Sequence, residues 1–425
     1  MKHYELAVKF YKEKGPKHDE NLWKIRQKRD AAIKEIKEWE ILRCKASEIK
    51  DYVVENLESL IEEFTKNAQK NGIEVYFAKD AKEHNEIVLK LLKEKNARKV
   101  VKSKSMLTEE CSLNEFLKQN GIEVVDTDLG ERIVQLRGEK PSHIVLPAIH
   151  TTKEDVAEIL HEKNTDPTYL THKMRKLLRE EFLTSRAAIT GANFLIADKG
   201  WAVVCTNEGN VDLGVTLNSL HIISAGVDKL LPNLKDLGLF LRMLARNATG
   251  QKITTYSTIF GKTDKRRVVI LVDNGRIQRS KGEFKDTLKC IRCSACLTTC
   301  PVFRRSGGHA YRYVIPGPIG SLLAPLSDKE EYKDLPFACT LCGSCEMVCP
   351  VKIPFSKQLV NMRKYVNEEN PLFKLAEKSM HSPEMFKLFS LILRLTPKPL
   401  LQKVIKEWSK YKALPEIPKR RFISL

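Results

Sequence analysis

Apolar side chains recur at helical spacings through the first 56 residues, between long series of charged ones. Leu22, Ile25, Ala32, Ile33 and Ile36 follow this spacing, and Lys, Arg and Glu fill many of the positions between them. We therefore expect residues 1–56 to form a basic helical arm that packs on the rest of the protein or on a partner. An arm that binds nucleic acid is the alternative.

From residue 57 to about residue 279, short apolar runs alternate with amphipathic stretches. We expect strands at residues 73–78, 99–102, 122–125 and 143–146, and helices at residues 81–96, 113–120 and 171–186. Strand–helix alternation of this kind is typical of a mostly parallel sheet whose faces are covered by helices. Residues 57–279 are therefore predicted to form an α/β domain.

The later part of this domain is richer in strands. Residues 193–197 and 202–205 flank Asp198, Lys199 and Gly200, a sequence that favours a hairpin turn. Further strands are expected at residues 221–224 and 268–271.

Cysteine spacing dominates the next region, residues 280–366. Eight of the eleven cysteines fall in two copies of the pattern C-x2-C-x2-C-x3-C-P, at Cys290, Cys293, Cys296, Cys300 and at Cys339, Cys342, Cys345, Cys349. This pattern holds a [4Fe–4S] cluster, and in two-cluster proteins the fourth cysteine of each run ligates the other cluster. The expected ligand sets are therefore Cys290, Cys293, Cys296 with Cys349, and Cys339, Cys342, Cys345 with Cys300.

The pattern has a direct physical reason. Three thiolates spaced in this way can surround one cluster from a tight loop, while the fourth arrives from a distant segment. Pro301 and Pro350 follow the last cysteine of each run, where a fixed φ turns the chain away. Nearby backbone N–H groups can then point at the sulfurs and tune the reduction potential.

Two other chemistries of cysteine fit less well. Structural zinc takes four ligands per ion, usually as two separated pairs, and does not need this spacing. Disulfides need an oxidising compartment, which nothing in the sequence indicates. Iron–sulfur clusters are therefore the expected cofactors.

The 38 residues between Cys300 and Cys339 are more than a minimal two-cluster ferredoxin needs. We therefore predict a mainly helical dicluster domain of the ferredoxin type, over residues 280–366. Tyr311 and Tyr313 lie between the runs and could cover a cluster or contact a partner.

The remaining residues, 367–425, are expected to form a helical, basic tail. Before this tail, a helix should begin after Pro354. Within the tail, a second helix should begin after Pro383, and a third, basic one should cover residues 400–411. The tail could cap the cluster domain, or it could lie at a membrane surface or against a partner, because its polar face is rich in lysine.

The composition limits the cellular location and the kinds of partner that we expect for this protein. The chain has 425 residues, 42% of them hydrophobic, and a formal net charge of +19. No export signal is recognised near the amino terminus, and no run approaches the ~18 apolar residues of a membrane span. We expect a cytoplasmic protein, with possible peripheral contact at the inner face of the membrane.

The positive net charge suits docking to redox partners or to that membrane. No nucleic-acid-binding motif is present, and no nucleic acid is expected as a partner.

Three stretches of the α/β region resemble the lactate-utilisation (LUD) domain. They are residues 136–144 (LRGEKPSHI), 189–194 (ITGANF) and 206–210 (TNEGN). Together with the cysteine runs they resemble the lactate utilisation protein B family, the iron–sulfur subunit of an L-lactate oxidation complex. The resemblance covers residue 57 to the tail, and implies a fold similar to the CoA-transferase and ribose-phosphate isomerase superfamily. It also implies a cysteine-rich subunit and a second LUD-domain subunit as partners, with an electron acceptor, but no catalytic residues.

The loop 206–210 is a candidate for binding a small molecule, since a Gly-centred turn can present N–H groups to an anion. Ser185 and Arg186 could assist; a plain turn is the alternative. His150, His161 and His172 show no metal-binding spacing, and are expected to be ordinary residues. There is no G-x-G-x-x-G fingerprint for a nicotinamide or flavin dinucleotide.

These observations support an electron-transfer subunit that carries electrons from L-lactate, or a related 2-hydroxy acid, through two [4Fe–4S] clusters. The alternative is that the α/β domain itself binds a substrate or cofactor, with the clusters as its electron outlet; Glu208 and Asn210 would then be essential. A redox-sensing nucleic-acid-binding protein is a third possibility.

Overall fold

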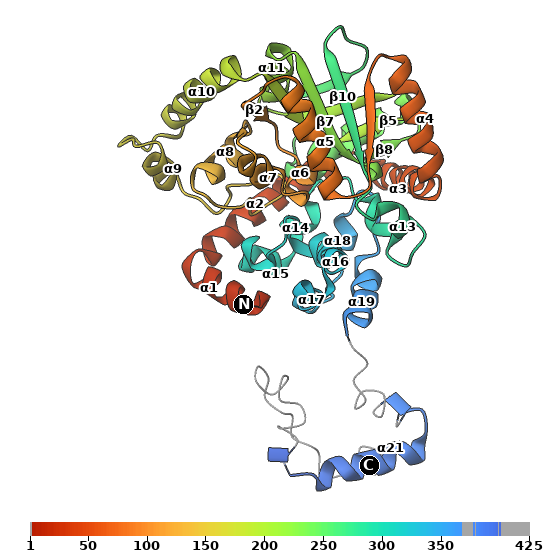
Figure 1. The fold of residues 1–425 in the computed structure, drawn as a ribbon. Helices are drawn as coiled ribbons and strands as arrows, with labels where there is room; N and C mark the ends of the chain where they lie inside the picture. The colour runs from red at the N-terminus through yellow and green to blue at the C-terminus, as the bar shows by residue number, and fades with distance from the viewer. Residues whose placement is uncertain (1, 368–376, 379, 398, 401–425) are drawn as a thin grey trace. The chain divides into compact units, whose positions relative to one another are not determined.

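The computed structural model describes residues 2–367, 377–378, 380–397 and 399–400. The chain divides into two compact units, Met1–Arg363 and Lys364–Leu425. The first unit contains the α/β domain and both cysteine runs (Figure 1).

The α/β domain is built on a six-stranded, fully parallel sheet. In spatial order its strands are β1 (Glu74–Ala78), β10 (Arg266–Val272), β7 (Leu220–Gly226), β4 (Ala187–Thr190), β2 (Lys99–Lys102) and β3 (Glu123–Asp126). Strands β4 and β7 are buried along their whole length, as expected where helices cover both faces. The predicted parallel sheet is confirmed.

Consecutive residues of each strand point to opposite faces of the sheet and build two separate cores. Val101, Ile223 and Val269 belong to one core, while the residues before them belong to the other. The first core is covered by α4 (Leu57–Lys70), α8 (Leu129–Leu136), α9 (Lys153–Ile159), α10 (Pro167–Thr184) and α11 (Asn210–Leu217). The second core is covered by α5 (Ala81–Glu94), α6 (Met106–Glu110) and α7 (Leu113–Gln119).

A second sheet of four strands extends the first core. Its order is β8 (Leu230–Leu231), β5 (Phe194–Ile196), β6 (Trp201–Thr206) and β9 (Tyr256–Phe260). Strands β5 and β6 pair antiparallel through the predicted turn, where Gly200 has a φ of +64° and lies against the backbone of α4. Helix α12 (Leu234–Thr249) packs on this sheet, with the Phe240 and Phe194 rings 5.3 Å apart. The predicted hairpin is confirmed.

The strand expected at residues 143–146 is absent, and that prediction is wrong. The segment folds back on itself, because His143 Nδ1 accepts hydrogen bonds from the backbone N–H groups of Val145 and Leu146. Ser142 closes the turn by bonding to the carbonyl of Pro147. The apolar side chains of this segment line a cavity instead of a sheet face.

The cysteine region follows α13 (Arg276–Ser280) and consists of short helices, with no β-strand in residues 280–366, all of which the structure describes. Its elements are η2 (Lys285–Lys289), α14 (Ala295–Thr299), α15 (Pro301–Ser306), η3 (His309–Tyr311), α16 (Gly317–Ser327), α17 (Lys329–Tyr332), η4 (Leu335–Ala338), α18 (Ser344–Val348) and α19 (Phe355–Val366). Figure 1 shows α14, α15, α16 and α18 gathered below the sheet.

The amino-terminal arm forms α1 (His3–Glu13), α2 (Gly15–Lys34) and α3 (Trp39–Glu55). Helix α2 packs on α12 of the α/β domain and on α14 and α15 of the cysteine region, and it buries Leu22, Arg29 and Ala32. The arm therefore packs on the rest of the protein, which is the first of its two expected roles.

In the second unit, α21 (Pro383–Leu395) occurs where a helix was expected after Pro383. Beyond Leu400, the helix expected at residues 400–411 lies outside the described residues. Among the described helices, none is both long enough and apolar enough to cross a membrane.

Candidate functional site

Two small cavities in the cysteine region are each bordered by four cysteines. The first, which we call site I, is lined by Cys290, Cys293, Cys296 and Cys349. The second, site II, is lined by Cys339, Cys342, Cys345 and Cys300. Each site therefore joins three cysteines of one run to the last cysteine of the other, as the crossed arrangement predicts.

The two runs repeat the same local geometry. Residues two and four positions after the first cysteine have positive φ in both runs: Arg292 and Ser294 in one, Leu341 and Gly343 in the other. These left-handed residues turn the backbone sharply. As a result, the N–H of Arg292 points at Cys290 Sγ at 3.4 Å, and that of Leu341 at Cys339 Sγ at 3.2 Å.

The last cysteine of each run receives equivalent hydrogen bonds. Phe303 N donates to Cys300 Sγ at 3.5 Å, and Ile353 N donates to Cys349 Sγ at 3.4 Å. Pro301 starts α15 at a position where no N–H is required, so the chain leaves the sulfur as a helix. Such N–H donors stabilise thiolate sulfur, which is the form that binds iron.

The two sites lie next to each other because α14 packs against α18. Each of these helices carries the third cysteine of its run, and Thr299 Oγ1 and Ser344 Oγ lie 2.5 Å apart across the contact. This packing leaves only a short path for electrons between the two sites.

Site I is the more enclosed of the two. Cys293, Cys296 and Cys349 are buried, and burial raises the pKa of Cys349 to about 12. With such a pKa the free thiol of Cys349 is protonated at neutral pH, so binding iron as a thiolate must release its proton.

Polar groups from the α/β domain and the arm surround site I. Asn247 of α12 donates from Nδ2 to Cys293 Sγ at 3.3 Å, and its Oδ1 accepts from Arg29 Nη2 at 2.6 Å. Arg43 of α3 donates to the carbonyl of Cys349 at 2.9 Å. Basic residues of the arm therefore compensate the negative charge that four thiolates would bring.

Site II is closer to solvent. Cys342 is exposed, and Cys300 and Cys339 are partly buried. Arg363 donates to the carbonyl of Cys339 at 2.6 Å.

Within the described residues, no three or more His, Cys, Asp or Glu side chains are placed as the ligands of a single metal ion. Zinc needs four ligands that converge at about 2.0–2.3 Å from one point. The thiols here instead border a cavity, and they fit a larger group such as an iron–sulfur cluster better than they fit zinc.

A much larger cavity, of about 580 Å³, lies between the sheet and site I. It is formed where the parallel strands end: Lys104 follows β2, Asp128 follows β3, Gly191 follows β4, and Lys229 follows β7. The carboxyl end of a parallel sheet is the usual position of ligand sites in open α/β folds. Ile291, Arg292 and Cys293 of the first run close its other side.

The candidate loop 206–210 lies on this cavity as a turn between β6 and α11. Asn210 is buried and its amide donates to Thr127 Oγ1 at 3.2 Å, so it holds the loop in place. Glu208 is exposed at the edge of the cavity and accepts from the backbone N–H of Leu129 at 3.0 Å. Partial desolvation, followed by the nearby Asp128 carboxylate, raises the pKa of Glu208 to about 7.

Other candidates from the sequence lie elsewhere. Ser185 and Arg186 precede β4, at the opposite end of the sheet from the cavity, so they cannot assist the loop. His150 is buried between Ser142 Oγ and Glu139 Oε2, each 2.7 Å away, and holds the 139–150 segment together. His161 and His172 are exposed and do not line the cavity.

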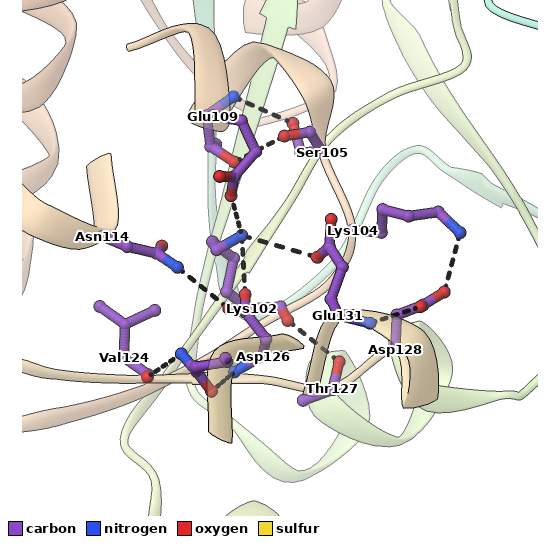
Figure 2. Close-up of polar contacts among 12 residues, drawn as sticks. Lys102, Lys104, Ser105, Glu109, Asn114, Val124, Asp126, Thr127, Asp128 and Glu131 are labelled. Carbon is purple, nitrogen blue, oxygen red and sulfur yellow. Dashed lines mark hydrogen bonds and ion pairs between the residues drawn. The ribbon is translucent and has the colours of Figure 1, made fainter. Parts of the chain in front are cut away.

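A cluster of buried charged side chains lies beside this cavity and is shown in Figure 2. The sequence analysis did not predict it. Lys102 is completely buried, with Asp126 at 2.7 Å, Glu109 at 3.1 Å and Glu131 at 3.8 Å from its Nζ. Burial lowers the pKa of Lys102, but the three carboxylates outweigh that effect and keep it well above its usual value. Burial raises the pKa of Glu131 well above its usual value, which favours the protonated form of this carboxyl more than in a free glutamate. The lysine at the carboxyl end of the short strand Lys99–Lys102 was the available signal.

Comparison with known families is consistent with this geometry. The LUD domain family matches residues 61–276, and the 4Fe-4S dicluster domain family matches residues 286–353.

Several curated proteins are similar along most of their length. "Lactate utilization protein B 1" of Bacillus mycoides is 41% identical over 85% of this chain and 80% of its own. "Lactate utilization protein B" of Oceanobacillus iheyensis is 38% identical over 88% and 83%, respectively. "Uncharacterized electron transport protein YkgF" of Escherichia coli is 39% identical over 84% and 78%. A solved DUF162 family protein from Deinococcus radiodurans covers 51% of this chain at 12% identity, with a TM-score of 0.30, too low to establish a shared fold.

Proposed function

This chain belongs to the lactate utilization protein B family, and we propose that it is the electron-transfer subunit of a multi-subunit oxidoreductase. The complex would oxidise L-lactate, or a related 2-hydroxy acid, to the 2-oxo acid. Its other members would be a cysteine-rich subunit, a second LUD-domain subunit and an electron acceptor.

The observation that carries the proposal is the pair of four-cysteine sites built by crossed, repeated runs. Cys290, Cys293, Cys296 and Cys349 would hold one cluster, and Cys339, Cys342, Cys345 and Cys300 the other. Two [4Fe–4S] clusters bound there supply one-electron transfer, at potentials set by charge, hydrogen bonds and exposure.

The residues around the two sites suggest the order of transfer. Site I is enclosed and shares a wall with the large cavity, whereas site II includes the exposed Cys342. Electrons would therefore enter from the cavity side at site I, cross the α14–α18 contact and leave to a partner at site II.

Iron analysis of the anaerobically purified chain tests the cofactor content. We expect about eight irons per chain, because each [4Fe–4S] site needs four. After reduction, electron paramagnetic resonance should show two interacting clusters. A content near four irons, with one isolated signal, would contradict the two-cluster assignment.

A second function has one specific observation in its favour. The 580 Å³ cavity lies within this chain, so the α/β domain could bind the substrate or a cofactor itself, with the clusters as its outlet. Loss of turnover in Glu208→Gln, with the iron content unchanged, would favour this second function.

A further inference from the structure

Two side chains of the first cysteine run carry buried hydrogen-bond donors at site I. Arg292 and Ser294 both line this site, and only 3% of the surface of Ser294 is exposed. Within the part of the chain that the structure describes, Arg292 Nη1 and Ser294 Oγ are buried without a hydrogen-bond partner. Because an unpaired buried donor is costly, a group bound at site I is expected to accept from both.

Arg292 also carries a positive charge that no carboxylate balances directly. Among the described residues, no carboxylate forms an ion pair with its guanidinium, and Asp228 and Glu110 are both bound by Arg276, at 2.7 and 2.8 Å. Burial lowers the pKa of Arg292, but nearby anions outweigh burial and raise it, and the Cys290 thiolate has the largest effect of these anions. The counter-charge of Arg292 is therefore the cysteine site itself.

The second run has the same backbone at these two positions but no donor side chains. Leu341 and Gly343 have φ values of +54° and +73°, against +59° for Arg292 and +62° for Ser294. Leu341 and Gly343 line site II, as their counterparts line site I. The shared geometry of the runs therefore does not require a cation and a hydroxyl at these positions, and the two donors are specific to site I.

Reduction of a cluster changes the charge that these donors would meet. A [4Fe–4S] cluster with its four thiolates carries a net charge of about −2 when oxidised and about −3 after it accepts one electron. A buried cation and a hydroxyl hydrogen both interact more strongly with the more negative form. They therefore favour the reduced state.

We infer that Arg292 and Ser294 raise the reduction potential of the cluster at site I, through a buried positive charge and two hydrogen-bond donors that site II lacks. This inference rests on the proposed function, in which electrons from a 2-hydroxy acid enter at site I. A raised potential there favours the first one-electron transfer into the chain. The electron passes on when the partner oxidises site II.

The first experiment makes site I resemble site II. The double variant Arg292→Leu/Ser294→Gly is purified without oxygen, and both clusters are titrated electrochemically and followed by electron paramagnetic resonance. Cys300→Ser identifies the signal of site II. At a fixed potential, the ratio of reduced to oxidised cluster at site I should fall at least about tenfold, equivalent to about 59 mV for one electron. Unchanged potentials at full iron content would overturn the inference.

Two single variants separate the charge of Arg292 from its shape. Arg292→Lys keeps the cation and should retain more of the potential than Arg292→Gln, which keeps a polar side chain without the charge. Arg242→Leu removes an exposed arginine of α12 and should leave both potentials unchanged. A potential in Arg292→Lys as low as that in Arg292→Gln would contradict the role of the charge.

The reciprocal variant keeps the inference testable if site I loses iron. Leu341→Arg/Gly343→Ser transfers both donors to site II, where a Cβ added at Gly343 meets no atom within 4 Å. The ratio of reduced to oxidised cluster at site II should rise at least about threefold, less than the change at site I because Leu341 is partly exposed and solvent screens the added charge. An unchanged potential at site II would overturn the inference. Clusters that are present with unchanged potentials would refute this inference alone, whereas a chain without clusters would refute the proposed function.

Discussion

Asn247 donates a hydrogen bond to the sulfur of Cys293 across 46 residues of sequence, at 3.3 Å. This contact joins α12 of the α/β domain to the first cysteine run. Asn247 is completely buried and is itself held by Arg29 of the arm, so three parts of the chain meet at site I.

Removing this donor should make the cluster at site I harder to reduce. A hydrogen bond to sulfur stabilises the more negative, reduced state, so Asn247→Ala should lower the potential by roughly 20–60 mV, equivalent to about 0.5–1.4 kcal/mol. A redox titration followed by electron paramagnetic resonance measures the shift. Asn71→Ala, which removes an amide at the residue that follows α4, is the control and should leave both potentials unchanged. The same potential in both variants would contradict the role of Asn247.

The crossed ligand sets predict which cluster each cysteine supports. Cys349→Ser should damage the cluster held mainly by the first run, because Cys349 lines site I. Cys300→Ser should damage the other. Mössbauer and electron paramagnetic resonance spectra distinguish the two, and Cys205→Ser is the control. Loss of the second-run cluster in Cys349→Ser would show that the ligands are not exchanged.

The exposure of Cys342 predicts unequal resistance to oxidation. Because Cys342 is exposed and Cys300 and Cys339 are only partly buried, limited oxygen should destroy the cluster at site II before that at site I. A time course of the two spectroscopic signals tests the order. Equal loss rates would mean that both sites are equally shielded.

The buried charges around Lys102 predict that two substitutions differ strongly in their effect on stability. Lys102→Ala leaves Asp126, Glu109 and Glu131 without their buried cation, and should cost about 3–5 kcal/mol of stability. Glu131→Gln removes a carboxyl whose charged form is disfavoured by burial, and should be tolerated better than Lys102→Ala. Denaturant unfolding followed by circular dichroism measures both.

The Glu131 carboxyl also makes the stability of the folded protein depend on pH. Burial raises the folded-state pKa of Glu131 above its ordinary value of 4.5, so the stability that its protonated form contributes is present below that pH and is lost as the pH rises toward the folded-state pKa. Glu131→Gln should therefore gain stability relative to the parent between pH 4.5 and neutrality. A constant difference across this range would show that Glu131 is ionised in the folded state.

Glu208 predicts a pH dependence of the reaction. If the α/β domain itself binds the substrate, as in the second function, and the Glu208 carboxylate accepts the substrate proton, the rate of lactate-driven reduction should rise with pH through about 7, where desolvation and the Asp128 carboxylate place the pKa of Glu208. Glu208→Gln should lower the rate at least about a hundredfold and remove this inflection. An unchanged pH profile in the variant would exclude Glu208 as the proton acceptor.

Short-range patterns made much of this structure predictable. Short apolar runs identify β1, β2 and β10, and the cysteine spacing predicts which four cysteines line each site. The apolar side chains of residues 143–146 form a pattern that is typical of a strand. That pattern contains no information on the hydrogen bonds that the backbone makes. Its shape depends on His143 bonding to the backbone ahead of it.

The features that the sequence did not reveal depend on contacts between distant segments. Neither Asn247 nor Arg29 lies near a cysteine in the chain, and their role appears only when α2 and α12 pack against α14. The large cavity is likewise formed by the ends of several strands together with the first cysteine run, so no single motif indicates it.

The central claim is that electrons from lactate pass through this chain. Its most direct test is to purify the complex without oxygen from its own cells, with partners retained, and to add L-lactate while recording the visible absorption of the clusters. We predict bleaching by lactate. Bleaching by a strong reductant but not by lactate would contradict the assigned substrate, and no response to either would contradict the electron-transfer role itself.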